Sequence, residues 1–103
     1  MASGGSRCKT GIVTGTGSDM SVEGVGFRPR RVQLINIDGN SRADWGEQMP
    51  DDAMAKIVDS GAGATDLSYV TTDGVTPSHD GFDLGADTDL NVSGEQVMWT
   101  CWD

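Results

Sequence analysis

Short runs of β-type residues, each followed by a turn signal, recur along this 103-residue chain and constrain its fold more than any other feature. The clearest run is residues 31–37 (RVQLINI), which follows Pro29 and ends at the turn sequence Asp38-Gly39-Asn40-Ser41. About eight short runs separated by such turns are typical of an all-β sandwich or barrel. The sequence therefore predicts an antiparallel β-sandwich, jelly-roll-like, with at most one short helix.

The other strands are expected from the same signals. They cover residues 7–14, 20–25, 53–58, 65–72, 81–84 and 95–102. Residues 50–58 also fit a helix, because Pro50, Asp51 and Asp52 suit a first helical turn. A strand is favoured there, since the helical run is short and both neighbours are β-type. Loops or turns are expected at 59–64, at Asp73-Gly74 and at 77–80.

The length fits one domain. Residues 1–6 are small and polar and are expected to form a flexible N-terminal tail, which leaves residues 7–103 for the β-sandwich. The first residues lack the apolar stretch of a secretion signal, and no apolar run approaches the length of a membrane span. We therefore expect a protein made in the cytoplasm that has no membrane partner.

Charge is distributed unevenly along the chain. Residues 1–50 carry six basic and five acidic side chains, residues 51–103 carry one and eleven, and the net charge is −9. Nucleic-acid binding is not expected, because phosphate contacts need a basic face. The only basic cluster is Arg28, Arg30 and Arg31. These arginines are a solvated strand entry, ion-pair partners of the acidic half, or part of a contact with another protein.

The residue pattern does not predict an enzyme. The single histidine, His79, lies between Ser78 and Asp80, but members of a catalytic triad normally converge from different elements and need an oxyanion hole. The glycine-rich pieces Gly15-Thr16-Gly17 and Gly61-Ala62-Gly63 lack the Gly-Lys-Ser/Thr that follows in a phosphate loop, and they are expected to be turns. No catalytic residue and no cofactor are expected.

Pairs of aspartates raise the question of a bound cation. Asp80 with Asp83, and Asp87 with Asp89, place carboxylates close together in loops, which calcium sites require. The spacing of an EF-hand is absent, and ordinary turns use the same residues. The sequence Asn91-Val92-Ser93 matches a glycosylation acceptor, which we attribute to chance because no secretion signal precedes it.

Cysteine and tryptophan residues supply the remaining candidates for a special role. Cys8 and Cys101 lie near opposite ends of the chain, so a disulfide is geometrically possible, but two reduced and buried thiols are favoured. The three tryptophans, Trp45, Trp99 and Trp102, either fill the core or include one or two interface anchors. Trp102 is the better candidate for an interface anchor, since a penultimate residue rarely has a complete core around it.

Several turn and packing motifs together resemble a group of small virion proteins of tailed bacteriophages. They are Gly26-Phe27-Arg28-Pro29-Arg30-Arg31-Val32, Trp45, Met49-Pro50, Gly81-Phe82-Asp83-Leu84-Gly85-Ala86-Asp87, Asn91-Val92-Ser93-Gly94 and Gln96-Val97-Met98-Trp99. The resemblance runs from about Gly11 to Trp102 and consists of turn and packing motifs, so it speaks to fold more than to role.

The resemblance implies a structural part of a virion. Proteins of this group are head decoration (cement) proteins, often trimeric, or modules of tails and fibres. The short chain favours a stand-alone decoration protein on the capsid exterior, a homotrimer whose partner is the major capsid protein. Arg28, Arg30, Arg31 and Trp102 are the expected partner-binding residues. The alternative is a tail or tail-fibre component that binds a host receptor or glycan.

Overall fold

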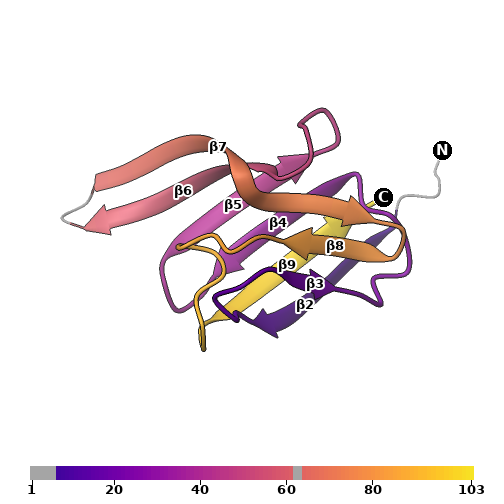
Figure 1. The fold of residues 1–103 in the computed structure, drawn as a ribbon, viewed down its shortest axis with the longest axis horizontal. Helices are drawn as coiled ribbons and strands as arrows, with labels where there is room; N and C mark the ends of the chain where they lie inside the picture. Colours follow the sequence, from indigo (N-terminus) through magenta and orange to yellow (C-terminus); the bar gives the residue numbers. More distant parts are fainter. Residues whose placement is uncertain (1–6, 62–63) are drawn as a thin grey trace.

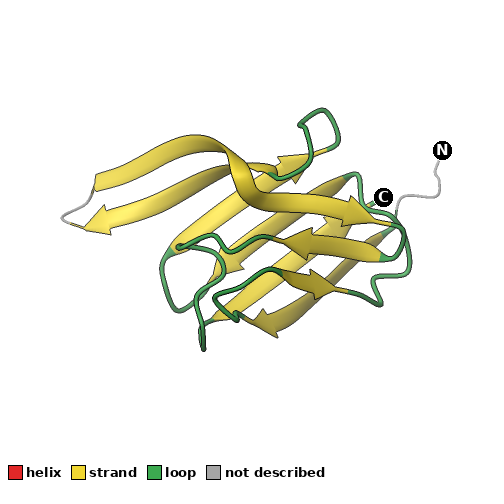
Figure 2. Cartoon of the chain, in the orientation of Figure 1, coloured by secondary structure: helices red, strands yellow, loops and turns green. Residues whose placement is uncertain are grey.

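All regular structure in the computed structural model, which describes residues 7–61 and 64–103, is β-strand. The predicted tail over residues 1–6 lies outside the described residues. The strands are β2 (Cys8–Thr14), β3 (Met20–Val22), β4 (Arg31–Asn36), β5 (Ser41–Gly46), β6 (Ala53–Gly61), β7 (Ala64–Ser78), β8 (Gly81–Leu84) and β9 (Gln96–Trp102). Figure 2 shows strands and loops and no helix in this part of the chain. The prediction of an all-β antiparallel domain is confirmed.

The strands form one antiparallel sheet in the order β2-β9-β4-β5-β6-β7-β8-β3. From β4 to β8 each strand pairs with the next one along the chain, and β9 then returns to lie between β2 and β4. The sheet curls on itself, so that β7, β8 and β3 face β2, β9, β4 and β5 (Figure 1). The result is a sandwich whose two layers belong to one nearly closed sheet.

Side chains close the seam between β2 and β3, the two outermost strands of the sheet. Lys9 donates from Nζ to the Gly24 carbonyl at 2.9 Å, and Arg7 stacks its guanidinium over the Phe27 ring at 5.0 Å. Two residues beyond Lys9 on β2, the Trp99 ring lies over Gly11, where an added Cβ would stand 2.5 Å from a ring carbon. Gly11 therefore leaves room for the aromatic ring that fills the seam.

The core lies between the two layers. Val32 and Leu34 of β4 point inward and are fully buried, as the alternation of their strand predicts. Phe82 of β8 meets Trp99 of β9 edge-to-face, with ring centroids 6.1 Å apart, and this pair joins the layers. The last strand, β9, lies between β2 and β4, and its outer face is open: Met98 is 37% exposed.

Strand β7 corrects two sequence predictions. It continues through Asp73-Gly74, where a turn was expected, because these residues form a bulge: Met54 pairs with Val70 but Ala53 with Val75. The bend carries β7 from β6 onto β8. Strand β7 also continues through Pro77, where a loop was expected. Strand β6 does not pair with β7 at this position, so the missing N–H of Pro77 costs no hydrogen bond between β6 and β7.

Three boundaries also differ from the prediction. The favoured strand over 53–58 is confirmed as β6, but it extends to Gly61, so the expected loop begins later and residues 62–63 lie outside the described residues. Strand β3 ends at Val22 rather than residue 25, because the chain then leaves the sheet with Gly24 and Gly26 at positive φ. The hairpin of β6 and β7 projects from the body (Figure 1), and the molecule measures 44 × 24 × 22 Å. We call residues 54–61 and 64–70 the arm.

Candidate partner-binding site

Three of the four predicted partner-binding residues meet where β4 begins and β9 ends. Arg31 pairs with Trp102 in the register, and its guanidinium lies 5.0 Å from the centre of the Trp102 ring. The backbone N–H of Arg30 donates to the Trp102 carbonyl at 2.8 Å. The strand pairing thus places the Arg31 side chain and the Arg30 backbone next to Trp102, which comes from the far end of the chain.

Arg28 lies in the loop before β4, beside the same end of the sheet. Its only described polar contact is a hydrogen bond from Nη1 to the Pro77 carbonyl at 3.5 Å. A hollow of about 490 Å³ opens between Arg28 and Arg30 and is also lined by Trp45, Glu47 and Asp51. Cationic, anionic and aromatic groups therefore share one concave surface.

Ion pairs of the two neighbouring arginines are exposed and loose. Arg30 stands 3.9 Å from Glu47, and these side chains are 70% and 50% exposed. Arg31 stands 3.4 Å from Asp44. Exposed pairs of this kind contribute roughly 0–1 kcal/mol, so an incoming carboxylate can replace them at little cost.

The three tryptophans differ in burial. Trp45 and Trp99 are buried, and Trp45 donates from Nε1 to the Pro50 carbonyl at 3.2 Å. Trp102 is only half-buried, with one ring face against Arg31. Among the three tryptophans, Trp102 is the one that offers contact area to another molecule.

The neighbours of His79 do not assemble a catalytic triad. They stay together in the β7–β8 turn, and the Asp80 carboxylate accepts the backbone N–H groups of Gly26 at 2.8 Å and Gly24 at 3.1 Å. These two hydrogen bonds hold the pKa of Asp80 below its usual value. Asp80 is thus committed to holding the loop after β3.

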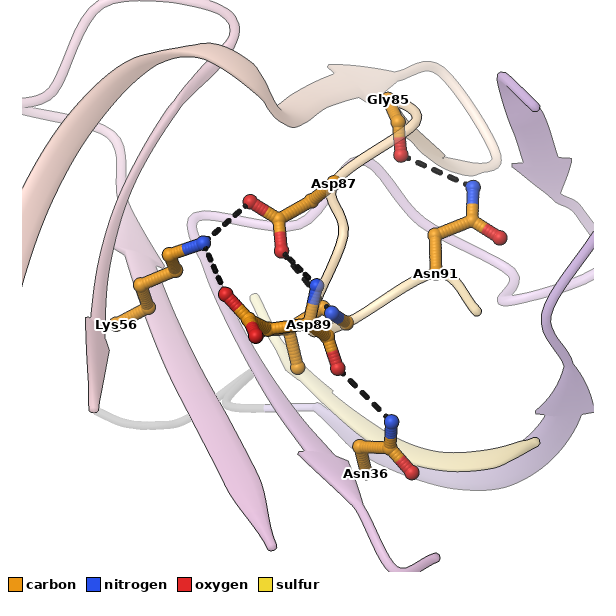
Figure 3. A network of polar contacts seen from close by, with 7 residues as sticks. Asn36, Lys56, Gly85, Asp87, Asp89 and Asn91 are labelled. Carbon is orange, nitrogen blue, oxygen red and sulfur yellow. Dashed lines mark hydrogen bonds and ion pairs between the residues drawn. The ribbon is translucent and has the colours of Figure 1, made fainter. Parts of the chain in front are cut away.

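A lysine stands between the aspartates proposed as a calcium pair. Lys56 of β6 donates from Nζ to Asp87 Oδ2 at 2.8 Å and to Asp89 Oδ2 at 2.7 Å (Figure 3). The second oxygen of Asp87 accepts the backbone N–H groups of Asp89 and Leu90. In the other proposed pair, Asp83 accepts the Ser21 hydroxyl at 2.6 Å. Within residues 7–61 and 64–103 no group of three or more His, Cys, Asp or Glu residues could hold a metal.

The Lys56 cluster is the feature that sequence reasoning missed. Burial lowers the pKa of Lys56, but its hydrogen bonds and charge interactions with Asp87 and Asp89 outweigh burial, and the pKa is raised overall. One signal was present: Lys56 is the only base in residues 51–103, which indicates an acidic partner but does not identify it.

Two buried asparagines anchor the same β8–β9 connection (Figure 3). Asn36 donates from Nδ2 to the Asp89 carbonyl at 2.8 Å and to Glu95 Oε1 at 2.8 Å. Asn91 donates to the carbonyls of Ser18 and Gly85 and accepts two backbone N–H groups from the 15–19 loop. Asn91 is 2% exposed, so its amide is inaccessible to a glycosyl donor.

The two cysteines point to opposite faces of the sheet. In the register Cys8 pairs with Trp102, and Lys9 pairs with Cys101. Directly paired residues share a face and successive residues alternate, so the side chains of Cys8 and Cys101 lie on opposite faces. Both thiols are free; Cys101 is buried, and burial raises its pKa to about 12. Cys8 is exposed, which corrects the expectation that both thiols are buried.

No protein-family model, no curated protein and no solved structure matches this chain. The resemblance to virion proteins of tailed phages stays a prediction. No helix in the described part of the chain is long and apolar enough to cross a membrane.

Proposed function

We propose that this protein is a capsid decoration protein of a tailed bacteriophage. It binds the outside of the phage head, contacts the major capsid protein, and stabilises the contacts between capsid subunits without performing chemistry. The observation that carries the proposal is the cluster of exposed cations around a half-buried tryptophan at one end of the sheet: Arg28, Arg30, Arg31 and Trp102.

The cluster has the chemistry of a docking surface for an acidic protein partner. Tryptophan and arginine are enriched among the residues that dominate binding energy at protein interfaces. Arg28 has no carboxylate partner among the described residues, and Arg30 has only the loose pair with Glu47. Because the rest of the protein is strongly acidic, this end is also where an acidic partner meets the least repulsion.

A protein of this kind stabilises an assembled shell by mass action. A ligand that binds only the assembled state shifts the equilibrium towards it by an amount set by its concentration and affinity. The proposal includes a homotrimer, because several modest contacts made at once raise the overall affinity of an assembly without any new contact. The proposed location is the capsid exterior.

The docking test compares two double variants with the same change of charge. Arg30→Gln with Arg31→Gln removes two positive charges from the cluster. Thr88→Glu with Ser93→Glu adds two negative charges in the loop at the other end of β4, where both side chains are exposed. We expect the arginine variant to lose at least tenfold in affinity for phage heads that lack the protein, and the control to lose far less.

The outcomes separate the site from the role. Equal loss in both variants would reject the arginine site, because only total charge would then matter. A wild-type protein that does not bind such heads would reject the decoration role. Heads with and without the protein would also be heated, and equal survival would contradict a stabilising function.

A second function is favoured by the hollow beside Arg28. Its mixture of arginine, carboxylate and aromatic groups also suits a glycan, so the alternative is a tail or fibre component that binds a receptor. Electron microscopy of virions carrying the labelled protein distinguishes the two, because label on the tail and loss of adsorption to cells support only the alternative.

A further inference from the structure

A row of mostly apolar side chains crosses six strands on the outer face of the sheet. The register places its members directly opposite one another from strand to strand. In order from β2 to β7 they are Ile12, Met98, Ile35, Arg42, Ile57 and Leu67. Directly paired residues share a face, so the row is a continuous stripe from the body to the arm.

The two ends of the row are its most exposed parts. Leu67 is 75% exposed on the arm, and its neighbour Tyr69 is 53% exposed on the same face. At the other end Ile12 is 57% and Met98 37% exposed. Scattered exposed apolar residues are normal, but an aligned row of them indicates a contact surface.

A hollow of about 320 Å³ lies on the same face near the root of the arm. Three isoleucines line it, Ile35, Ile37 and Ile57, together with polar groups that include Arg42 and Thr65. The outer face is therefore concave where the arm leaves the body, and a second molecule can seat apolar side chains there.

Charge on this face identifies the partner. The described strand residues that the register places on it include two arginines, Arg31 and Arg42, and two aspartates, Asp44 and Asp59. Their charges cancel, so the net charge of −9 belongs to the rest of the protein. Two equally acidic copies repel one another over most of their surface, and this neutral face is where they can meet without that penalty.

We propose that this face joins copies of the chain, with the Leu67 end of one row lying against the Ile12 end of the row in a second copy. When one row is reversed and laid on another, Leu67 meets Ile12 and Ile57 meets Met98, so apolar groups meet at both ends. Arg42 then faces Ile35 and keeps its pair with Asp44 at 3.8 Å. The arm supplies one half of the contact and the body the other.

The area of the face is sufficient for a modest interface. Six strands at about 4.8 Å spacing and about seven residues at 3.3 Å give a flat footprint near 24 × 23 Å, roughly 550 Å². A standard interface buries about 800 Å² on each partner, and weaker complexes bury less. We therefore expect association that depends on concentration. Because each copy presents the same row to the other, the contact is two-fold and joins two copies. The inference goes beyond the proposed function and does not depend on its homotrimer.

Directed disulfides test the contact in full-length protein with Cys8→Ser, which leaves only the buried Cys101. One protein carries Ile12→Cys and the other Leu67→Cys, with tags of different size, and the two are mixed under mild oxidation. Within one chain these positions are about five strand spacings, or roughly 24 Å, apart, which no disulfide spans. Glu23→Cys replaces Ile12→Cys in the control, since Glu23 is exposed and lies outside this face.

We expect the Ile12/Leu67 pair to form at least tenfold more mixed disulfide than the Glu23/Leu67 pair. Equal yields would overturn the proposal. Sedimentation gives an independent readout. The double variant Ile12→Lys with Leu67→Lys should weaken association. Glu23→Lys is the control, because it reduces the net negative charge by the same amount at a position outside the face. A wild-type monomer at about 100 µM, a concentration that reveals even weak complexes, would also overturn it.

The same experiments separate this inference from the proposed function. A mass of two chains that falls in the lysine variant supports the contact and contradicts the homotrimer. A mass of three chains would contradict the two-fold contact, because a surface that meets itself closes with two copies. Self-association that survives while binding to phage heads fails leaves the contact in place and rejects the decoration role.

Discussion

Two of the places where basic and acidic side chains meet in this molecule are built in opposite ways. At the β8–β9 connection, Lys56 is enclosed, with its side chain 11% exposed and two carboxylates within 2.8 Å. At the start of β4, Arg30 is 70% exposed and stands 3.9 Å from its only described carboxylate. The first arrangement holds the fold together, and the second leaves its charge available to another molecule.

Burial explains why the difference matters. Removing one member of a buried pair leaves the other charge dehydrated and unpaired, which is costly, whereas an exposed pair is replaced by water. The lesson is that the acidic half of the chain uses its single base internally. The basic cluster of the other half is exposed, so its side chains can contact another molecule without disturbing the fold.

The strongest test of this comparison removes the enclosed cation. Lys56→Met keeps the length of the side chain but leaves Asp87 and Asp89 without a counter-charge, and we expect a loss of about 3 kcal/mol of unfolding free energy. The measurement is urea denaturation. Arg30→Met is the matched control and should change stability by less than about 0.5 kcal/mol. Equal effects would erase the distinction between the two clusters.

The next test removes the asparagine that ties the same connection to the 15–19 loop. Asn91→Ala leaves the N–H groups of Thr16 and Gly17 and two carbonyls without their partner, so we expect a loss of about 2 kcal/mol. Denaturation would be compared with Ser93→Ala, an exposed neighbour that should be neutral. A change below about 0.5 kcal/mol would show that water replaces the amide freely.

High pH gives a smaller and reversible version of the Lys56 test. Because the pKa of Lys56 is raised above its ordinary 10.5 in the folded protein, its pairing stabilises the fold fully below that pH. The stabilisation is lost as pH rises from 10.5 through the folded pKa. The melting temperature of the wild type should therefore fall more over this range than that of Lys56→Met. Parallel curves would contradict the assigned role.

The difference between the clusters also explains what the sequence could predict. Alternation and turn signals identified the strands and the shared face of Val32 and Leu34, because those signals are local. Which face points inward became clear only from the structure. Arg30 and Arg31 were expected to lie together because they are adjacent in the sequence. The incomplete burial of Trp102 was expected because it is next to the end of the chain. The bulge at Asp73-Gly74 was taken for a turn, since both use the same residue types.

The Lys56 contacts were out of reach because they are not local. Lys56 and Asp87 are 31 residues apart, and only the folding of β6 over the β8–β9 connection brings them together. An aspartate pair such as Asp87 and Asp89 has the same appearance in a sequence whether a metal ion or a lysine neutralises it. Whether a lysine reaches the two aspartates depends on the pairing of β6 and on how the whole sheet curls.

The smallest expected effect concerns Asp80, which shows that exposure alone does not leave a charge available. Hydrogen bonds from the N–H groups of Gly26 and then Gly24 lower its pKa below 3.8, so it stabilises the fold above that pH. This contribution is lost as pH falls below 3.8 through the folded pKa. Asp80→Asn keeps one acceptor oxygen and should flatten the acid side of the stability profile slightly, which denaturation at a series of acid pH values would measure. Identical acid profiles for wild type and Asp80→Asn would show that the loop after β3 does not depend on this carboxylate.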